Sequence, residues 1–105
     1  MALQEIQREV DKWVSQYKVG YFDPKDIMLR LMEETGELAR EVNHMYGPKQ
    51  KKLEEAKKDL GAEVGDILFT IVCLANREEI DLDESWKKVM DKCYGRDAGR
   101  YEKKP

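Results

Sequence analysis

The chain has 105 residues, of which 39% are charged and 41% hydrophobic, with a formal net charge of −3. This composition predicts one soluble domain over residues 1–105 rather than a disordered chain. The small negative charge disfavours a nucleic-acid partner, and the longest apolar run, at residues 71–75, is too short to span a bilayer. The amphipathic N-terminus is unlike a signal peptide. We therefore expect a cytoplasmic protein without a nucleic-acid or membrane partner.

Four helical segments are predicted in chain order, at about residues 3–18, 24–46, 50–78 and 83–103. Within them, apolar residues recur at spacings of three and four, which is the helical period. Asp23 is the predicted N-cap of the second segment, where Pro24 suits the first turn, and Gly47-Pro48 ends it. Asp83 is the predicted N-cap of the fourth segment. Residues 49–52 read KQKK, a short exposed basic loop or helix start.

The expected fold is all-α and resembles a four-helix bundle with antiparallel helices. The second and third segments are joined by a short link, so they should form an antiparallel hairpin. A chain of this size buries little core, and the first and fourth segments are apolar on more than a narrow stripe. We therefore expect oligomerisation to complete the bundle.

Two carboxylate pairs lie on the second and third segments. Glu34 and Glu37 are separated by three residues, as are Glu63 and Asp66, so each pair lies on one helix face with Cβ atoms roughly 5–6 Å apart. Apolar neighbours border both pairs, which places them beside buried stripes. Glu33 adds a third acid to the first pair. Antiparallel packing of the two helices would therefore bring four carboxylates together.

Such a cluster needs a counter-charge. Two unit charges about 4 Å apart repel by about 4 kcal/mol at an effective dielectric near 20. Oxygen ligands favour Mg²⁺ or Mn²⁺ over zinc, and Mg²⁺ commonly shares its ligands with a substrate phosphate. Gly36 and Gly65 each precede the second carboxylate of a pair, which suggests close approach of a helix or ligand. A lone EExxE is a solvated face about nine times in ten; the conjunction with ExxD is more specific.

The two motifs, residues 33–38 (EETGEL) and 63–66 (EVGD), resemble the EExxE…ExxD signature of the MazG-like nucleotide pyrophosphohydrolases. These belong to the all-α NTP pyrophosphatase superfamily, and the resemblance covers most of the chain. It implies Mg²⁺-dependent cleavage of a nucleoside triphosphate (dNTP or NTP) between the α and β phosphates, giving a monophosphate and pyrophosphate. Nucleotide-pool housecleaning is the implied role.

The resemblance also implies roles for single residues. The metal ligands would be Glu34, Glu37, Glu63 and Asp66. Glu33 would orient or deprotonate the attacking water. Family members with one copy of the motif form dimers or dimers of dimers, with the site completed across subunits.

Substrate contacts are assigned more loosely. Trp13, Tyr17 and Phe22 lie where the family places part of its base pocket, although any one aromatic residue more often packs in a core. Asn76 either contacts nucleotide or caps a helix, and His44 has no expected catalytic role. Three basic residues of the last segment resemble residues that meet phosphates in the family, while a solvated face explains them nearly as well: Lys88, Lys92 and Arg96.

Two other classes of protein compete with this interpretation. A di-iron bundle needs Glu-x-x-His on two helices, whereas His44 is the only histidine. A non-catalytic helical interaction or regulatory module would keep the fold but has no need of four intact ligand positions. The sequence leaves open the preferred base and sugar, the number of metal ions, the identity of the catalytic base and the choice between dimer and tetramer.

Overall fold

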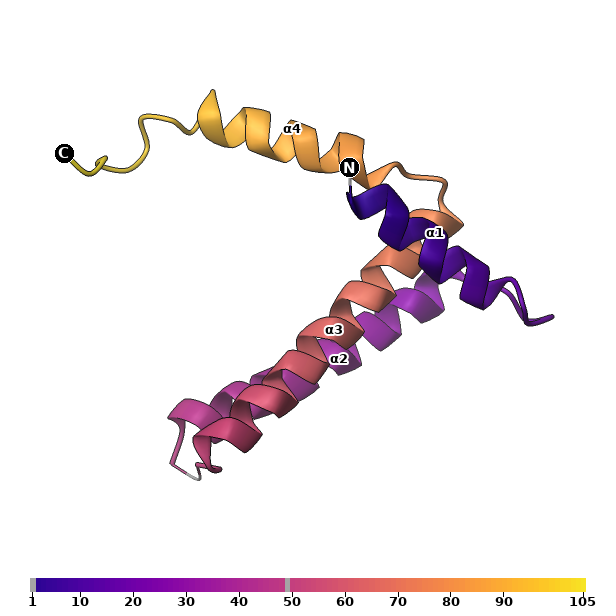
Figure 1. The fold of residues 1–105 in the computed structure, drawn as a ribbon, viewed down its shortest axis with the longest axis horizontal. Helices are drawn as coiled ribbons and strands as arrows, with labels where there is room; N and C mark the ends of the chain where they lie inside the picture. Colours follow the sequence, from indigo (N-terminus) through magenta and orange to yellow (C-terminus); the bar gives the residue numbers. More distant parts are fainter. Residues whose placement is uncertain (1, 49) are drawn as a thin grey trace.

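The computed structural model describes residues 2–48 and 50–105. Four helices account for most of them: α1 (Ala2–Val14), α2 (Pro24–Tyr46), α3 (Leu53–Arg77) and α4 (Leu82–Tyr94). Figure 1 shows α2 and α3 side by side as a long antiparallel hairpin, with α1 crossing one end of α3 and α4 extending beyond it. No strand occurs among the described residues, so the all-α prediction is confirmed. Residue 49 of the expected basic loop lies outside them.

The helix ends follow local capping chemistry. The bounds of α2 agree with the prediction, and Asp23 caps it by accepting a hydrogen bond from the Lys25 amide at 2.9 Å. The predicted cap of α4 is wrong, because Asp81 rather than Asp83 caps this helix, accepting from the Asp83 amide at 2.9 Å. Helix α4 also ends nine residues earlier than expected, where the amide of Gly95 donates to the Asp91 carbonyl.

The seam between α2 and α3 has a regular register. Side chains that are buried or half-buried recur at spacings of three and four along both helices, as expected for two helices packed along their length. On α2 these positions are Ile27, Leu31, Glu34, Leu38, Glu41 and Met45; on α3 they are Ala56, Leu60, Glu63, Ile67, Thr70 and Leu74. Three glutamates therefore occupy positions at which an ordinary hairpin would bury apolar residues.

Helix α1 is attached to α3 by a small core and a polar network. Val10 and Val14 pack with Val72, which is fully buried. Beside this core, the Asn76 side-chain amide donates to the Gln7 carbonyl and to the Tyr21 hydroxyl, both at 2.9 Å. These contacts fix α1 across the end of α3 that is remote from the α2–α3 link.

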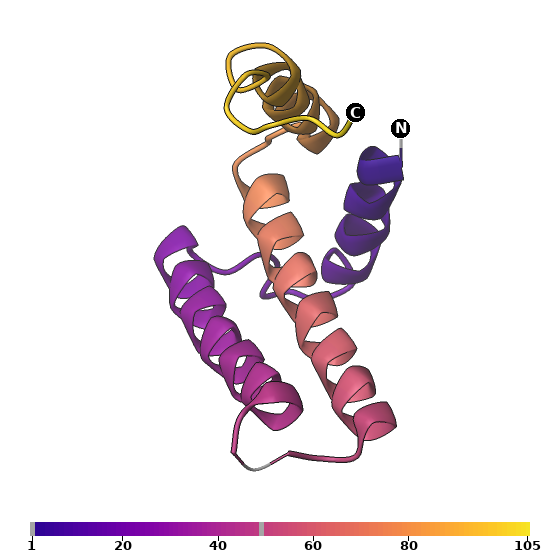
Figure 2. The same cartoon turned by 90° about the vertical axis from the view of Figure 1, so that its left-hand side faces the viewer.

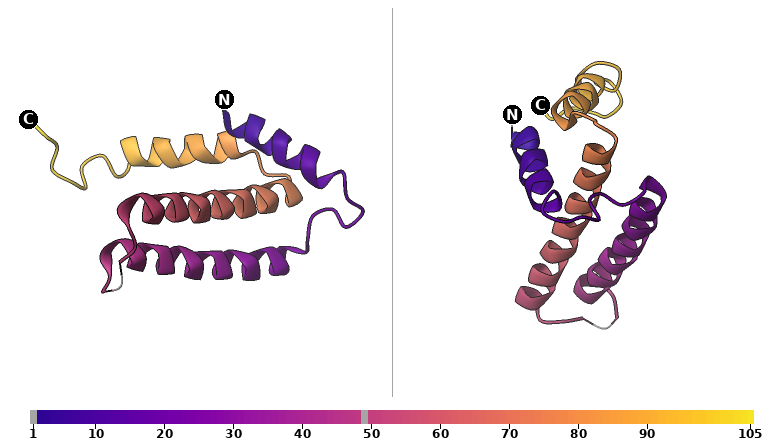
Figure 3. Two further views of the ribbon diagram at one scale, coloured as in Figure 1. Left: turned by 60° about the horizontal axis from the view of Figure 1, so that its bottom comes forward. Right: turned by 90° about the vertical axis from the view of Figure 1, so that its right-hand side faces the viewer.

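Much apolar surface lies outside this core. Figure 2 and the right-hand view of Figure 3 show α4 beyond the end of α3, where it contacts α1 instead of packing along the hairpin. The radius of gyration is 17.2 Å, whereas a compact domain of this length has about 13 Å. Met32, Val64 and Trp86 are 68%, 53% and 48% exposed. Despite this apolar surface, none of the helices in the described part of the chain has the length and hydropathy to cross a membrane.

Candidate active site

Three of the predicted ligands meet at the middle of the α2–α3 seam. Glu34 and Glu37 of α2 and Glu63 of α3 each offer a carboxylate oxygen, and these oxygens all lie within 4.8 Å of one another. We call these three residues the open cluster. Asp66, one turn along α3 from Glu63, is exposed and lies outside this group of three.

The open cluster is electrostatically unsatisfied. Glu34 and Glu63 are half-buried, and the Oε2 atom of each is buried without a hydrogen-bond partner among the described residues. Burial, and then the neighbouring carboxylates of Glu37 and Asp66, raise the pKa of Glu34 above its ordinary value. Burial raises the pKa of Glu63 to about 7, with further contributions from Glu37 and then from Asp66 and Glu34. A proton or a cation relieves this repulsion.

The donor set of the open cluster fits a hard divalent cation. All three groups offer carboxylate oxygens, which suit Mg²⁺ or Mn²⁺ and lack the nitrogen or sulfur that zinc favours. The unpartnered oxygens of Glu34 and Glu63 are the atoms that such an ion would bind. The carboxylate of Asp66 contributes to the raised pKa of both Glu34 and Glu63, so it lies near the open cluster although it is not one of its three members.

The two glycines beside the carboxylates, Gly36 and Gly65, have open space around them in the described part of the chain. A Cβ atom built at Gly36 or Gly65 meets nothing within 4 Å. Among the described residues, no other helix therefore approaches either glycine closely. The open space on both helices leaves approach by a ligand or by another molecule as a prediction.

A second group of charges lies on the same seam, towards the α2–α3 link. Glu41, 4% exposed, accepts from Lys51 Nζ at 3.2 Å and lies 3.2 Å from His44 Nδ1. Lys51 Nζ also donates to Asp59 Oδ2 at 2.8 Å. Arg40 Nε lies 3.7 Å from the other Glu41 oxygen. We call Glu41, Lys51 and Asp59 the bridged cluster.

The bridged cluster has the opposite electrostatics to the open cluster. His44, and then Lys51, lower the pKa of Glu41 despite its burial. The hydrogen bond from Lys51 likewise lowers the pKa of Asp59, and Asp59, followed by Glu41, raises the pKa of Lys51. Sequence reasoning missed this group. The three-and-four spacing that continues from Glu34 through Leu38 to Glu41 was the available signal, but nothing in the sequence fixes where a loop lysine lies.

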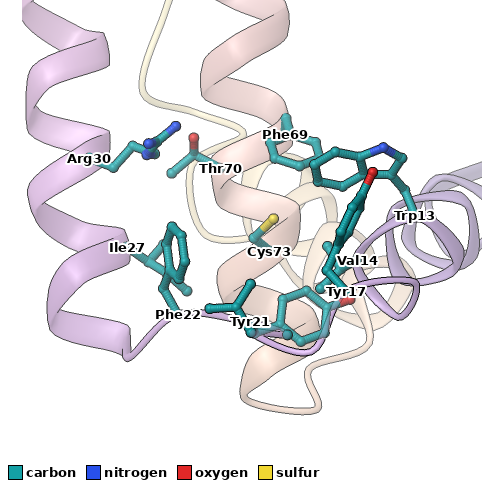
Figure 4. A pocket seen from close by; sticks show the side chains of 12 residues that line it. Trp13, Val14, Tyr17, Tyr21, Phe22, Ile27, Arg30, Phe69, Thr70 and Cys73 are labelled. Atoms are coloured by element: carbon teal, nitrogen blue, oxygen red, sulfur yellow. The ribbon is translucent and has the colours of Figure 1, made fainter.

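An apolar pocket of about 490 Å³ opens one helical turn from the open cluster, at the junction of α1, α2 and α3. Figure 4 shows Trp13 and Tyr17 on the α1 side of this pocket, with Phe22 and Ile27 opposite them. The Trp13 ring lies 5.1 Å from that of Tyr17 and 5.8 Å from that of Phe69.

Two polar residues line the pocket on the side of the cluster. Arg30 precedes Glu34 by one turn of α2, and Thr70 follows Asp66 by one turn of α3, donating to its carbonyl at 3.0 Å. The pocket and the open cluster are therefore consecutive along one seam.

The remaining predicted site residues lie elsewhere. Glu33 is exposed and lines a shallow hollow with Asp26 and Arg30. The Asn76 amide is engaged in the α1–α3 network. Lys88 and Lys92 lie on α4, which packs against α1 and extends away from the hairpin (Figure 1). Arg96 is not on the last helix as predicted, since α4 ends at Tyr94.

Comparison with known proteins gives consistent matches. The family model described as the MazG nucleotide pyrophosphohydrolase domain matches residues 22–101. The YpjD protein of Bacillus subtilis (strain 168) is 51% identical over 102 residues, which are 97% of this chain and 92% of that protein. The crystal structure of YpjD from Bacillus subtilis superposes with a TM-score of 0.79 at 52% identity, over 88% of this chain and 94% of that one.

A second solved structure is similar. The crystal structure of the Bacillus-conserved MazG protein, described as a nucleotide pyrophosphohydrolase, has a TM-score of 0.76 and 43% identity, covering 88% of both chains.

Proposed function

Because the chain belongs to the MazG nucleotide pyrophosphohydrolase family, we propose that it hydrolyses nucleoside triphosphates, dNTP or NTP, between the α and β phosphates with Mg²⁺. The oxygen of water forms a new P–O bond, and the P–O bond that bridges the α and β phosphates breaks. The products are a nucleoside monophosphate and pyrophosphate. Mn²⁺ is the expected substitute ion. The open cluster is the single observation that carries this proposal, because three carboxylates converge there and two of them have a buried oxygen without a hydrogen-bond partner among the described residues.

The proposed residues divide the work. Glu34, Glu37 and Glu63 would hold the metal, and Asp66 would join them. When bound, the metal would neutralise the triphosphate and lower the pKa of the attacking water. Glu33, which precedes Glu34 on α2 and is exposed, is the proposed residue that would orient or deprotonate this water.

The apolar pocket is the proposed site of the nucleobase. Its volume of about 490 Å³ is within the range of small-molecule sites, which is roughly 300–1,000 Å³. Trp13 and Tyr17 present aromatic faces suited to stacking. One helical turn separates Arg30 of the pocket from Glu34 of the open cluster, a rise of about 6 Å. A base in the pocket would therefore leave its phosphates beside the carboxylates.

We also propose that the enzyme works as a dimer or a dimer of dimers. The exposed apolar residues of the hairpin and α4 support this, because a single chain leaves them uncovered. Lys88 and Lys92 lie on a helix that extends away from its own hairpin. If they bind phosphate, they most simply do so at the open cluster of another copy. Removal of unwanted nucleotides from the pool is the proposed role.

The test is a pyrophosphate-release assay with each dNTP and NTP, with Mg²⁺ and with chelator. We expect release of pyrophosphate, not orthophosphate, for at least one nucleotide and only with the metal. Orthophosphate would mean that another bond breaks. No product from folded protein with any nucleotide would favour the non-catalytic interaction module. Sedimentation of the same sample tests the oligomer, and a monomer at assay concentration would contradict that part.

A further inference from the structure

The bridged cluster continues the row of acids that begins at the open cluster. Along α2, Glu41 follows Glu37 by four residues, and along α3, Asp59 precedes Glu63 by four. Residues four apart lie on the same helix face, one turn apart. Lys51 therefore joins the two helices at the turn next to the carboxylates of the open cluster.

Lys51 is held at both its backbone and its side chain. Its amide donates to the His44 carbonyl at 2.9 Å, near the C-terminus of α2. Its Nζ atom contacts Glu41 of α2 at 3.2 Å and Asp59 of α3 at 2.8 Å. The side chain is 28% exposed, against 5% for that of Glu41. A charge-assisted link of this kind, with one partner buried, restricts the geometry more than an exposed ion pair does.

We propose that Lys51 is a positioning residue for the metal site: its ammonium bridges Glu41 and Asp59, and thereby fixes the spacing between α2 and α3 at Glu37 and Glu63. This inference rests on the proposed function only in that the open cluster binds a divalent cation. Without the bridge, Glu41 and Asp59 would repel across the seam, and the helices would separate at the next turn. The three carboxylates would then meet less often in the geometry that binds metal.

The sign of the effect on metal affinity distinguishes positioning from simple electrostatics. Removing the positive charge of Lys51 makes the seam more negative, and this change by itself strengthens the binding of a cation. Loss of positioning weakens binding instead. Partners that orient metal ligands typically change affinity by about 10–100-fold, so the positioning effect should prevail.

The experiment measures Mn²⁺ binding to the nucleotide-free protein by isothermal titration calorimetry. We expect Lys51→Met to weaken Mn²⁺ binding by about tenfold or more, and Lys51→Arg to stay close to wild type because its guanidinium can still bridge. Lys57→Met, which removes an exposed lysine from the same end of α3, is the matched control and should not change affinity. Unchanged or tighter binding by folded Lys51→Met would overturn the proposal.

A charge-neutral variant covers the case in which Lys51→Met does not fold. Glu41→Met combined with Lys51→Met removes one charge of each sign, and replacing a buried ion pair by apolar residues is commonly tolerated. The bridge is lost without a change in net charge, so we expect Mn²⁺ binding about tenfold weaker than wild type. Wild-type affinity in this folded variant would also overturn the proposal.

Failure of the proposed function gives a different result. Wild-type protein that binds Mn²⁺ but releases no pyrophosphate would contradict the reaction, while the comparison of Lys51 variants would still decide the positioning role. If neither the wild-type protein nor Lys57→Met binds Mn²⁺, the open cluster is not a metal site, and both proposals fail.

Discussion

The open and bridged clusters lie on the same two helices, one turn apart, and have opposite electrostatics. In the bridged cluster, His44 and then Lys51 lower the pKa of Glu41, which is 4% exposed. In the open cluster, where Glu34 and Glu63 are less buried, burial and neighbouring acids raise the pKa of both. The clusters differ because the ammonium group of Lys51 lies between the acids of the bridged cluster. A buried acid with a cation from its own chain contributes to the fold, whereas half-buried acids without one favour a proton or a cation from solution.

The largest expected effect comes from substituting one glutamate in each cluster. Glu63→Gln should lower pyrophosphate release at least about 100-fold, because it removes a proposed ligand. The same change should leave the metal-free protein as stable as wild type or more so at neutral pH, because it removes a repelled charge. Glu41→Gln should do the reverse, lowering the melting temperature while keeping activity within about tenfold at saturating Mg²⁺.

Circular dichroism melting in chelator and the pyrophosphate assay measure both properties. A folded Glu41→Gln protein as inactive as Glu63→Gln would break the distinction between the clusters. So would unfolding of Glu63→Gln, which would make that carboxylate a structural group.

A smaller effect on metal binding is expected from substituting Asp66, the residue at which the sequence motif and the observed geometry disagree. The resemblance to the family makes Asp66 a ligand equal to Glu63, but the structure leaves it exposed and outside the group of three. Asp66→Asn should therefore weaken Mn²⁺ binding by about tenfold, and Glu37→Gln by more. Calorimetry on the two variants tests this order. Equal losses would mean that Asp66 contributes as much to metal binding as Glu37 does.

The parts predicted from sequence are those set by local spacing. Three-and-four periodicity identified four helices, and the Asp23 cap and Gly47-Pro48 fixed the bounds of α2. The same spacing brought Glu34, Glu37 and Glu63 onto facing sides of a hairpin. The end of α4 was missed, because Gly95 ends it while polar residues after it keep a helical spacing. Lys51 was treated as part of an exposed loop, since its position depends on how the link folds back over α2.

The smallest expected effect is the pH dependence of stability in the metal-free protein, to which the two clusters contribute with opposite signs. The folded-state pKa of Glu63 is about 7, above its ordinary 4.5. The folded protein therefore keeps a proton that the unfolded chain loses, and this group makes stability fall as pH rises from about 4.5 to about 7. Glu41 and Asp59 have lowered pKa values. Their contribution is present above their ordinary values of 4.5 and 3.8 and is lost as pH falls through the lowered ones.

Melting temperature against pH in chelator should therefore pass through a maximum on the acid side of neutrality, with a decline of a few degrees towards pH 7. Glu63→Gln should reduce this decline to the part that Glu34 contributes, and it should leave the loss at low pH unchanged, because the bridged cluster is intact. Mg²⁺ should also oppose the decline, since the ion binds the ionised carboxylates. A Glu63→Gln protein that declines like wild type would show that the open cluster is not the source of the effect. Of the two clusters, only the bridged cluster would then contribute to the pH dependence of stability, through the contacts of Lys51 with Glu41 and Asp59.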